Sequence, residues 1–121
     1  MSQALQSMEN ILLEELTSTM ETIWSSDARA RESVESSQWM EAYELSAMLV
    51  DLLKSKRVTC ESIRQRVIEL HSTHTEQEEQ IQRCVDMSTF LLNAISKYLA
   101  IYQRVLVALM DKLSGTRSPL G

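Results

Sequence analysis

The chain has 121 residues, 44% of them hydrophobic, and a formal net charge of −5 at pH 7. That apolar fraction excludes an intrinsically disordered composition, and an acidic chain lacks the basic surplus typical of nucleic-acid binders. Both glycines and the single proline stand at or beyond Gly115. A β-rich fold depends on turns that contain Gly and Pro, so it is excluded in favour of long helices in one domain.

The first predicted helix covers residues 3–35. Its apolar side chains recur at steps of three and four, which places them on one helical face. They are Leu5, Met8, Leu12, Leu16, Met20 and Ile23, with Ile11, Leu13 and Trp24 widening the stripe. The pattern weakens after Trp24, and residues 27–37 are expected to form a solvated helix end or a loop.

The second predicted helix covers residues 37–71, and either Ser36 or Ser37 can serve as its N-cap. Its later part carries a stripe with the period of a coiled-coil seam. The stripe consists of Leu53, Lys56, Cys60, Ile63, Val67, Leu70 and His74. A break is expected at residues 72–75, because Thr75 and Glu78 have capping-box spacing. A single continuous helix through this segment is the alternative, since the segment has neither Gly nor Pro.

The third predicted helix covers residues 75–113, with a stop at Ser114-Gly115 and a flexible tail over residues 115–121. Isolated helices gain little net stability in water, so the three must pack laterally. Short connections make consecutive helices antiparallel. The sequence therefore predicts an all-α protein, an elongated antiparallel three-helix bundle with coiled-coil-like packing, as a single domain over residues 1–114.

The third helix is apolar around most of its circumference between Phe90 and Met110, which is wider than the stripe that one buried face needs. The seam of this helix consists of Ile81, Cys84 with Val85, Ser88, Leu91 with Leu92, Ile95, Tyr98 with Leu99, Tyr102, Val105 with Leu106, Leu109 and Leu113. In helical projection, Ile101 and Val107-Ala108 lie well off this main seam. Two interpretations stay open at this point. The helix is central and contacts both others, or its C-terminal half leaves an apolar groove for a partner helix.

Charge is unevenly distributed along the chain. Residues 1–37 carry seven acids against Arg29 and Arg31, so the entire net charge of −5 lies in this part. A basic cluster on the second helix is expected to pair with acids on its own surface, or to dock against the acidic first helix. Its members are Lys54, Lys56, Arg57, Arg64 and Arg66.

No pattern in the sequence indicates catalysis. A Gly-rich phosphate loop, a nucleophile motif and a recognisable acid–base pair are all missing from the sequence, so the chain is expected not to be an enzyme and to need no cofactor. His71 and His74 stand near Glu78, but a zinc site needs more ligands and a supporting shell. The expectation is therefore solvated histidines and no metal.

Two features bear on the compartment. The two cysteines, Cys60 and Cys84, without a Cys-x-x-Cys motif or a secretory leader, favour a reducing cytoplasm and buried thiols. The longest apolar region is interrupted by polar and charged residues, so a membrane span is not expected. The interruptions are Asn93, Ser96, Lys97, Gln103 and Arg104.

In layout, the chain resembles the FlgN type of flagellar export chaperone. The resemblance lies in a Leu-rich N-terminal helix, a polar stretch, a Leu-rich second helix and an apolar third helix. The segments concerned are Ile11 to Leu16, then Leu45, Leu49, Leu52, Leu53 and Lys56, and finally Phe90-Leu91-Leu92.

That resemblance implies a cytoplasmic chaperone that binds terminal amphipathic segments of secreted axial proteins before export. It implies that the partner helix contacts the third helix. The residues expected to bind it are Leu91, Ile95, Leu99, Tyr102 and Leu106. Self-association into a homodimer is left open.

The alternative from another class is a structural coiled-coil subunit of a larger multi-protein assembly, since the seams on the second and third helices suit it equally. The two differ in behaviour. A chaperone is expected to be soluble alone, whereas an obligate subunit is expected to aggregate or stay partly unfolded without its partners.

Overall fold

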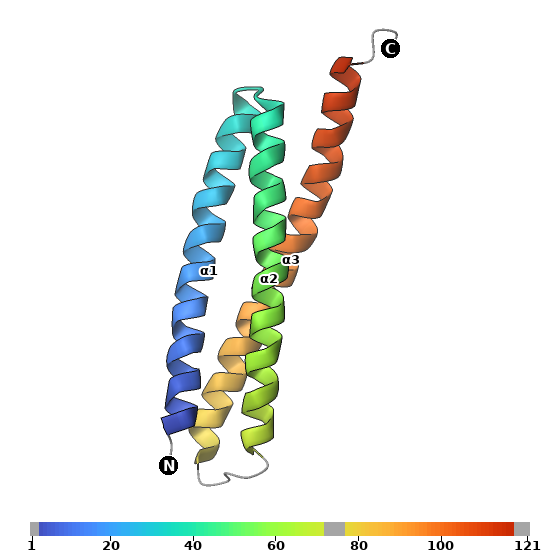
Figure 1. Ribbon diagram of the computed structural model, residues 1–121. Coiled ribbons are helices and arrows are strands. Elements are labelled where there is room, and N and C mark those ends of the chain that lie inside the picture. Colours follow the sequence, from blue (N-terminus) through green and yellow to red (C-terminus); the bar gives the residue numbers. More distant parts are fainter. Residues whose placement is uncertain (1–2, 72–76, 118–121) are drawn as a thin grey trace.

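The chain forms three long helices that pack against one another (Figure 1). The computed structural model describes residues 3–71 and 77–117. Within those ranges the elements are α1 (Gln3–Glu35), α2 (Trp39–His71) and α3 (Glu78–Arg117), and no strand occurs in them. The predicted all-α three-helix bundle is confirmed. No helix in the described ranges has an apolar stretch long enough to cross a membrane.

The helices run up, down and up, but the three pairs are not equally close. α1 and α2 lie side by side along their length, whereas α3 crosses α2 and its C-terminal half leans away from α1 (Figure 1). Contacts are most extensive between α2 and α3 and least extensive between α1 and α3. The bundle is therefore tight around α2 and more open between α1 and α3.

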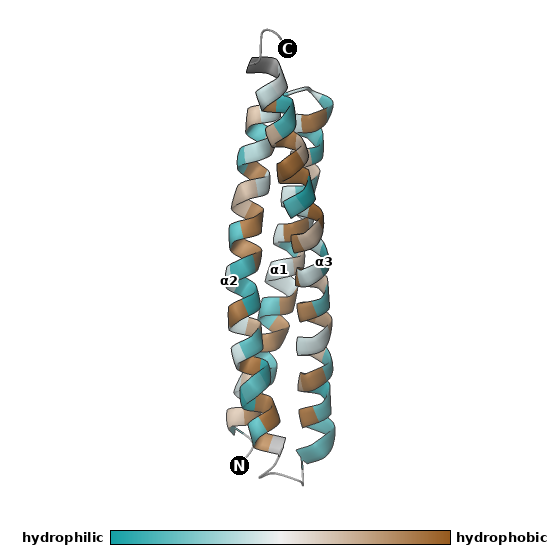
Figure 2. Ribbon diagram, turned by 90° about the vertical axis from the view of Figure 1, so that its right-hand side faces the viewer, coloured by the Kyte–Doolittle hydropathy of each residue, from teal (hydrophilic) through white to brown (hydrophobic). Residues whose placement is uncertain are grey.

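The core follows the heptad rhythm of the sequence. On α1, Leu5, Leu12 and Thr19 are buried seven residues apart, and Ile23 and Ala30 continue the buried stripe. Figure 2 shows the resulting alternation of hydrophobic and hydrophilic patches along every helix. One buried cluster gathers near the N-terminal end of α1, and a second occupies the middle and the opposite end. The regularly spaced positions of the predicted stripes thus form the core. Ile11, Leu13 and Trp24, which were expected to widen the stripe of α1, are exposed, and His74 lies outside the described residues.

Side chains buried near the α1–α2 turn are small. They are Ala30 and Ser33 on α1, and Ala42 and Ser46 on α2. Small side chains supply little apolar surface for a third helix to cover, and burial stabilises in proportion to apolar area. This end of the bundle therefore has the weakest hold on α3, which is the end where α3 diverges (Figure 1).

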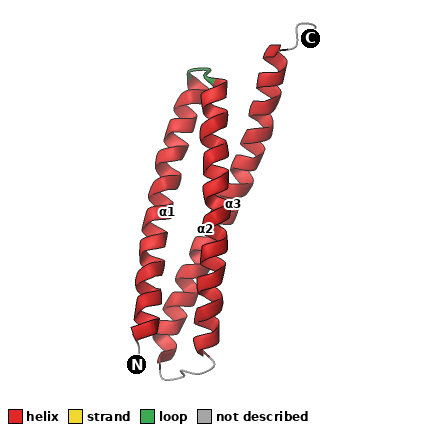
Figure 3. Cartoon of the chain, in the orientation of Figure 1, coloured by secondary structure: helices red, strands yellow, loops and turns green. Residues whose placement is uncertain are grey.

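The turn between α1 and α2, drawn in green in Figure 3, is a Schellman motif built around Ser37. The N–H of Gln38 donates to the carbonyl of Ser33 at 2.8 Å, and the N–H of Ser37 donates to that of Val34 at 3.0 Å. Ser37 has a φ of 58°. The expected N-cap at Ser36 or Ser37 is therefore wrong. Both serines complete the end of α1, which is helical through Glu35, and α2 begins at Trp39.

At the second junction, α2 ends at His71 and α3 begins at Glu78, and the two helices pack on each other rather than forming one continuous rod. Residues 72–76, which include Thr75 of the expected capping box, lie outside the described residues. The expected stop at Ser114-Gly115 is wrong, because α3 continues to Arg117. A single glycine costs a helix only about 1 kcal/mol relative to alanine, which does not terminate it. Residues 118–121 also lie outside the described part.

Candidate protein-binding surface

The five residues nominated as partner contacts lie inside the bundle. Leu91, Ile95, Leu99 and Tyr102 are buried in the larger core cluster, and Leu106 packs half-buried against it. Their spacing of three and four residues places them on the side of α3 that covers α2, the helix with which α3 has its most extensive contacts. In this structure the expected groove at these side chains is instead core, so a partner could contact them only if the helices separated.

The apolar residues that α3 does expose are others. They are Phe90, Ile101, Val107 and Met110, with exposed fractions of 57%, 37%, 60% and 52%. Ile101 and Val107 are among the residues that lie off the main seam in helical projection. The wide apolar surface of α3 therefore has two parts. The side chains of the seam are buried in the core, and those of the flanks are exposed to solvent.

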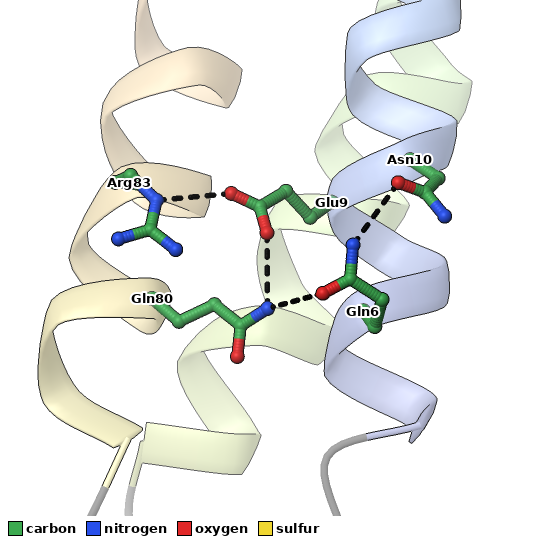
Figure 4. Close-up of polar contacts among 5 residues, drawn as sticks. All are labelled: Gln6, Glu9, Asn10, Gln80 and Arg83. Atoms are coloured by element: carbon green, nitrogen blue, oxygen red, sulfur yellow. Dashed lines mark hydrogen bonds and ion pairs between the residues drawn. The ribbon is translucent and has the colours of Figure 1, made fainter.

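A polar layer joins α1 to α3 at the end where both helices begin (Figure 4). Arg83 Nε donates to Glu9 Oε2 at 3.0 Å, and Gln80 Nε2 donates to Glu9 Oε1 at 2.9 Å. Gln80 also reaches Gln6 Oε1 at 3.1 Å. These hydrogen bonds, from Gln80 first and Arg83 second, lower the pKa of Glu9. The layer closes this end of the α1–α3 interface.

Further along, a second polar contact ties the same two helices. The Tyr102 hydroxyl donates to Asp27 Oδ1, and Arg31 Nε lies 2.9 Å from Asp27 Oδ2. Burial, followed by the hydrogen bond to Asp27, raises the pKa of Tyr102. The tyrosine hydroxyl is thus neutral and serves as a donor, and it holds α3 to α1 within the C-terminal half of α3.

α1 and α3 run in the same direction, and these two contacts fix how the helices are aligned along the axis of the bundle. Two residues at the same height along that axis are called level below. The pairs Glu9–Arg83 and Asp27–Tyr102 differ by 74 and 75 residues (83 − 9 and 102 − 27). A residue of α1 therefore lies near the level of the α3 residue about 75 positions later. On this register Leu13 is level with position 88, close to Phe90, and Trp24 is level with position 99, close to Ile101.

The same side chains share the flanks where α1 and α3 meet. Leu13 follows Glu9 by four residues, and Trp24 precedes Asp27 by three, so both lie on the side of α1 that carries its contacts to α3. Phe90 follows Arg83 by seven residues, and Ile101 follows Phe90 by eleven, which keeps them on one side of α3. Leu13, Trp24 and Phe90 are 49%, 60% and 57% exposed.

Beyond the Tyr102–Asp27 contact the interface opens into a groove of about 280 Å³. Ala30 and Val34 of α1 and Ile101 and Val105 of α3 supply its apolar walls; the other lining residues are Asp27, Arg31, Glu35 and Tyr102. Small-molecule pockets usually span roughly 300–1,000 Å³ and enclose their ligand. An open groove slightly below that range suits one or two apolar side chains of a protein partner better. We define the α1–α3 face as this groove together with Leu13, Trp24 and Phe90.

The basic cluster on α2, the two cysteines and the potential metal ligands were the other candidates for a functional site. Lys56 Nζ lies 2.7 Å from Glu15 Oε2, so one member of the basic cluster on α2 does dock against α1. Cys60 and Cys84 are buried free thiols, and burial raises the pKa of Cys60 to about 11. Across residues 3–71 and 77–117, no group of three or more His, Cys, Asp or Glu side chains is placed to hold a metal.

The partner surface expected from the sequence lay on the third helix alone, and the structure places exposed apolar side chains of α1 beside α3. Leu13 and Trp24 lie beside the main apolar stripe of α1, and Val34 lies beyond its end. The extra width of that stripe was the feature of the sequence that could have indicated an exposed apolar flank on α1. What the sequence could not supply was the register between α1 and α3. No protein-family model, curated protein or solved structure gave a significant match to this chain.

Proposed function

We propose that this chain is a non-enzymatic protein-binding module that holds an amphipathic helix of a partner protein on its α1–α3 face. The observation that carries the proposal is the gathering of large exposed apolar side chains on both flanks of the least extensive helix interface. Leu13, Trp24 and Val34 come from α1, and Phe90 and Ile101 come from α3. A partner helix laid between α1 and α3 would cover them and complete a four-helix arrangement.

The length of the face suits a helix. On the shared register it extends from Leu13 to Val34, a difference of 21 residues, which corresponds to about 30 Å at about 1.5 Å per residue. Burial of apolar surface contributes about 25 cal/mol per Å² before the cost of ordering the partner. The five side chains, which are between 37% and 60% exposed, supply the apolar surface that such a partner would cover.

Within this class we propose the role of an export chaperone, which keeps an amphipathic segment of a secreted flagellar or secretion-system protein bound in the cytoplasm. The layout that resembles the FlgN type supports this choice, since such chaperones bind terminal amphipathic segments. An exposed apolar face on a chain with net charge −5 supports it as well, because that charge keeps a protein with exposed apolar residues soluble.

Tryptophan fluorescence tests the proposal directly. Trp24 and Trp39 are the two tryptophans, so a Trp39→Phe variant reports on the α1–α3 face alone. We expect synthetic terminal segments of exported axial proteins from the same genome to shift the Trp24 emission to the blue and to saturate. Ile101→Ser should weaken binding while leaving the helical circular dichroism unchanged.

Met48→Ser is the matched control, because Met48 is 68% exposed on α2 and lies outside the face. It should bind as the parent does. If the segments leave Trp24 emission unchanged, or if Met48→Ser and Ile101→Ser weaken binding equally, the proposed site is wrong.

The rival function, a structural subunit of a coiled-coil assembly, is favoured by the exposed apolar residues outside the face. Met40, Met48 and Val58 on α2 and Val107 and Met110 on α3 would then contact other subunits. Sedimentation of the purified chain separates the two, because a chaperone should be soluble and folded alone, whereas an obligate subunit should aggregate.

A further inference from the structure

The two walls of the α1–α3 face carry opposite charge. Over residues 12–35 of α1, which are level with residues 87–110 of α3, six acids stand against Arg29 and Arg31, and Arg31 is paired with Asp27. Between Met87 and Met110 of α3 the charged side chains are Lys97 and Arg104, both basic. The face is therefore bordered by an acidic segment on one side and a basic segment on the other.

Several of these charges are available to a partner. Glu21 precedes Trp24 by three residues, and Glu35 lines the groove. Lys97 and Arg104 lie four residues before and three residues after Ile101, which places them on its side of α3. All four are exposed. None of them forms an ion pair with another residue of the described ranges, unlike Glu9, Glu15 and Asp27, which are paired within the fold.

One pair of these charges lies at a matching level. By the offset of about 75 residues, Glu21 is level with position 96, next to Lys97, across the width of the face. A helix lying between the walls would have one flank beside acidic side chains and the other flank beside basic side chains. Like charges placed opposite one another are unfavourable, so a helix with two equally charged flanks would meet repulsion on one side.

Resting on the proposed function, we infer that the partner helix has a basic flank and an acidic flank on either side of its apolar stripe, so that basic residues face α1 and acidic residues face α3. A uniformly basic or uniformly acidic amphipathic helix fits this face less well. Rotating the helix end for end exchanges its flanks, so the arrangement of charge also fixes the direction in which a given partner lies.

Three synthetic helical peptides of about 20 residues test the inference. They share one apolar stripe and differ only in their flanks, which carry Lys on one side and Glu on the other, Lys on both, or Glu on both. With the Trp39→Phe protein at low salt, we expect the mixed peptide to bind about three- to tenfold more tightly than either uniform peptide, the range for a few exposed ion pairs. Added salt should remove the difference.

Charge-reversal variants make the test specific. Lys97→Glu with Arg104→Glu makes both walls acidic, and preference should move to the Lys-only peptide. Glu21→Lys with Glu35→Lys makes both walls basic, and preference should move to the Glu-only peptide. Arg29→Glu with Arg66→Glu, two exposed cations away from the face, is the control and should keep the preference for the mixed peptide.

The outcomes separate this inference from the function on which it rests. If all three peptides bind equally and the variants show no change, the charge inference is overturned while helix binding stands. If no peptide binds, the proposed function itself fails. If the protein alone forms a dimer that Trp24→Ser disrupts, a second copy occupies the face and the inference is overturned.

Discussion

Arg83 donates to Glu9 at 3.0 Å and joins the first turns of α3 to α1, and this pair closes one end of an interface that is open at the other. Glu9 is mostly buried, with 13% of its side chain exposed, whereas Arg83 is 58% exposed. This ion pair, called the clasp below, therefore stabilises the α1–α3 interface locally, and the stabilisation requires that Glu9 be ionised.

The clasp predicts acid sensitivity. Folding lowers the pKa of Glu9 below its ordinary value of 4.5, so its stabilisation is complete above that pH and is lost as the pH falls through the folded value. We expect Glu9→Gln to lower the free energy of unfolding at pH 7 by about 0.5–1 kcal/mol. It should also flatten the decline of that free energy as the pH falls below 4.5. Urea denaturation at each pH measures this, with Glu14→Gln, an exposed acid, as the control. Equal acid profiles for the two variants would contradict the role of the clasp.

The second contact between α1 and α3 gives a local prediction. Tyr102→Phe removes the hydroxyl that donates to Asp27 and should cost about 1 kcal/mol of stability. Because this contact joins α3 to α1 beside the groove between them, hydrogen exchange should accelerate mainly in residues 100–113. Uniform acceleration along α3 would show instead that the divergent half depends on other contacts.

The turn at Ser37 stores removable strain. Its φ of 58° disfavours a side chain with a Cβ, and glycine adopts this conformation at no steric cost. We expect Ser37→Gly to raise the free energy of unfolding by about 0.5–1 kcal/mol. Ser37→Val should lower it by more than that, because a β-branched residue suits this region least. Thermal unfolding followed by circular dichroism should rank the three proteins in that order.

Thr19 offers a stabilising change inside the core. Its side chain is fully buried and its hydroxyl has no hydrogen-bond partner among the described residues. Valine has nearly the same shape without the hydroxyl, so Thr19→Val should stabilise the protein by about 1 kcal/mol. A loss of stability on urea denaturation would indicate that the hydroxyl has a partner such as a buried water.

Residues of the seam and the flank of α3 should respond differently. Leu99 is 4% exposed and Ile101 is 37% exposed. Leu99→Ala should cost about 2–5 kcal/mol, whereas Ile101→Ala should stay within about 1 kcal/mol. Leu99→Asp combined with Leu106→Asp should unfold the domain. If that double variant kept its helicity, Leu99 and Leu106 would be surface residues that a partner could contact, as the sequence suggested.

Helices and the identity of the core were determined by the sequence itself. The period of three and four residues is a local property, so Leu5, Leu12 and Ile23 on α1 and Cys60 and Val67 on α2 could be assigned to buried faces before any tertiary information. Leu91 and Ile95 on α3 were instead expected at a partner surface, and only the packing of α3 showed that they are core. The lack of Gly and Pro before residue 115 likewise settled the helical class.

Tertiary structure alone decided which flanks of those helices remain open. Whether Leu13, Trp24, Phe90 and Ile101 meet on one face depends on the register of two helices separated by about 75 residues, which Glu9–Arg83 and Asp27–Tyr102 set. The conformation of Ser37 was equally beyond the sequence, because serine suits an N-cap and a left-handed helix end alike. Helical period is encoded within a turn or two of chain, whereas the angle between α1 and α3 is the result of packing across the whole bundle.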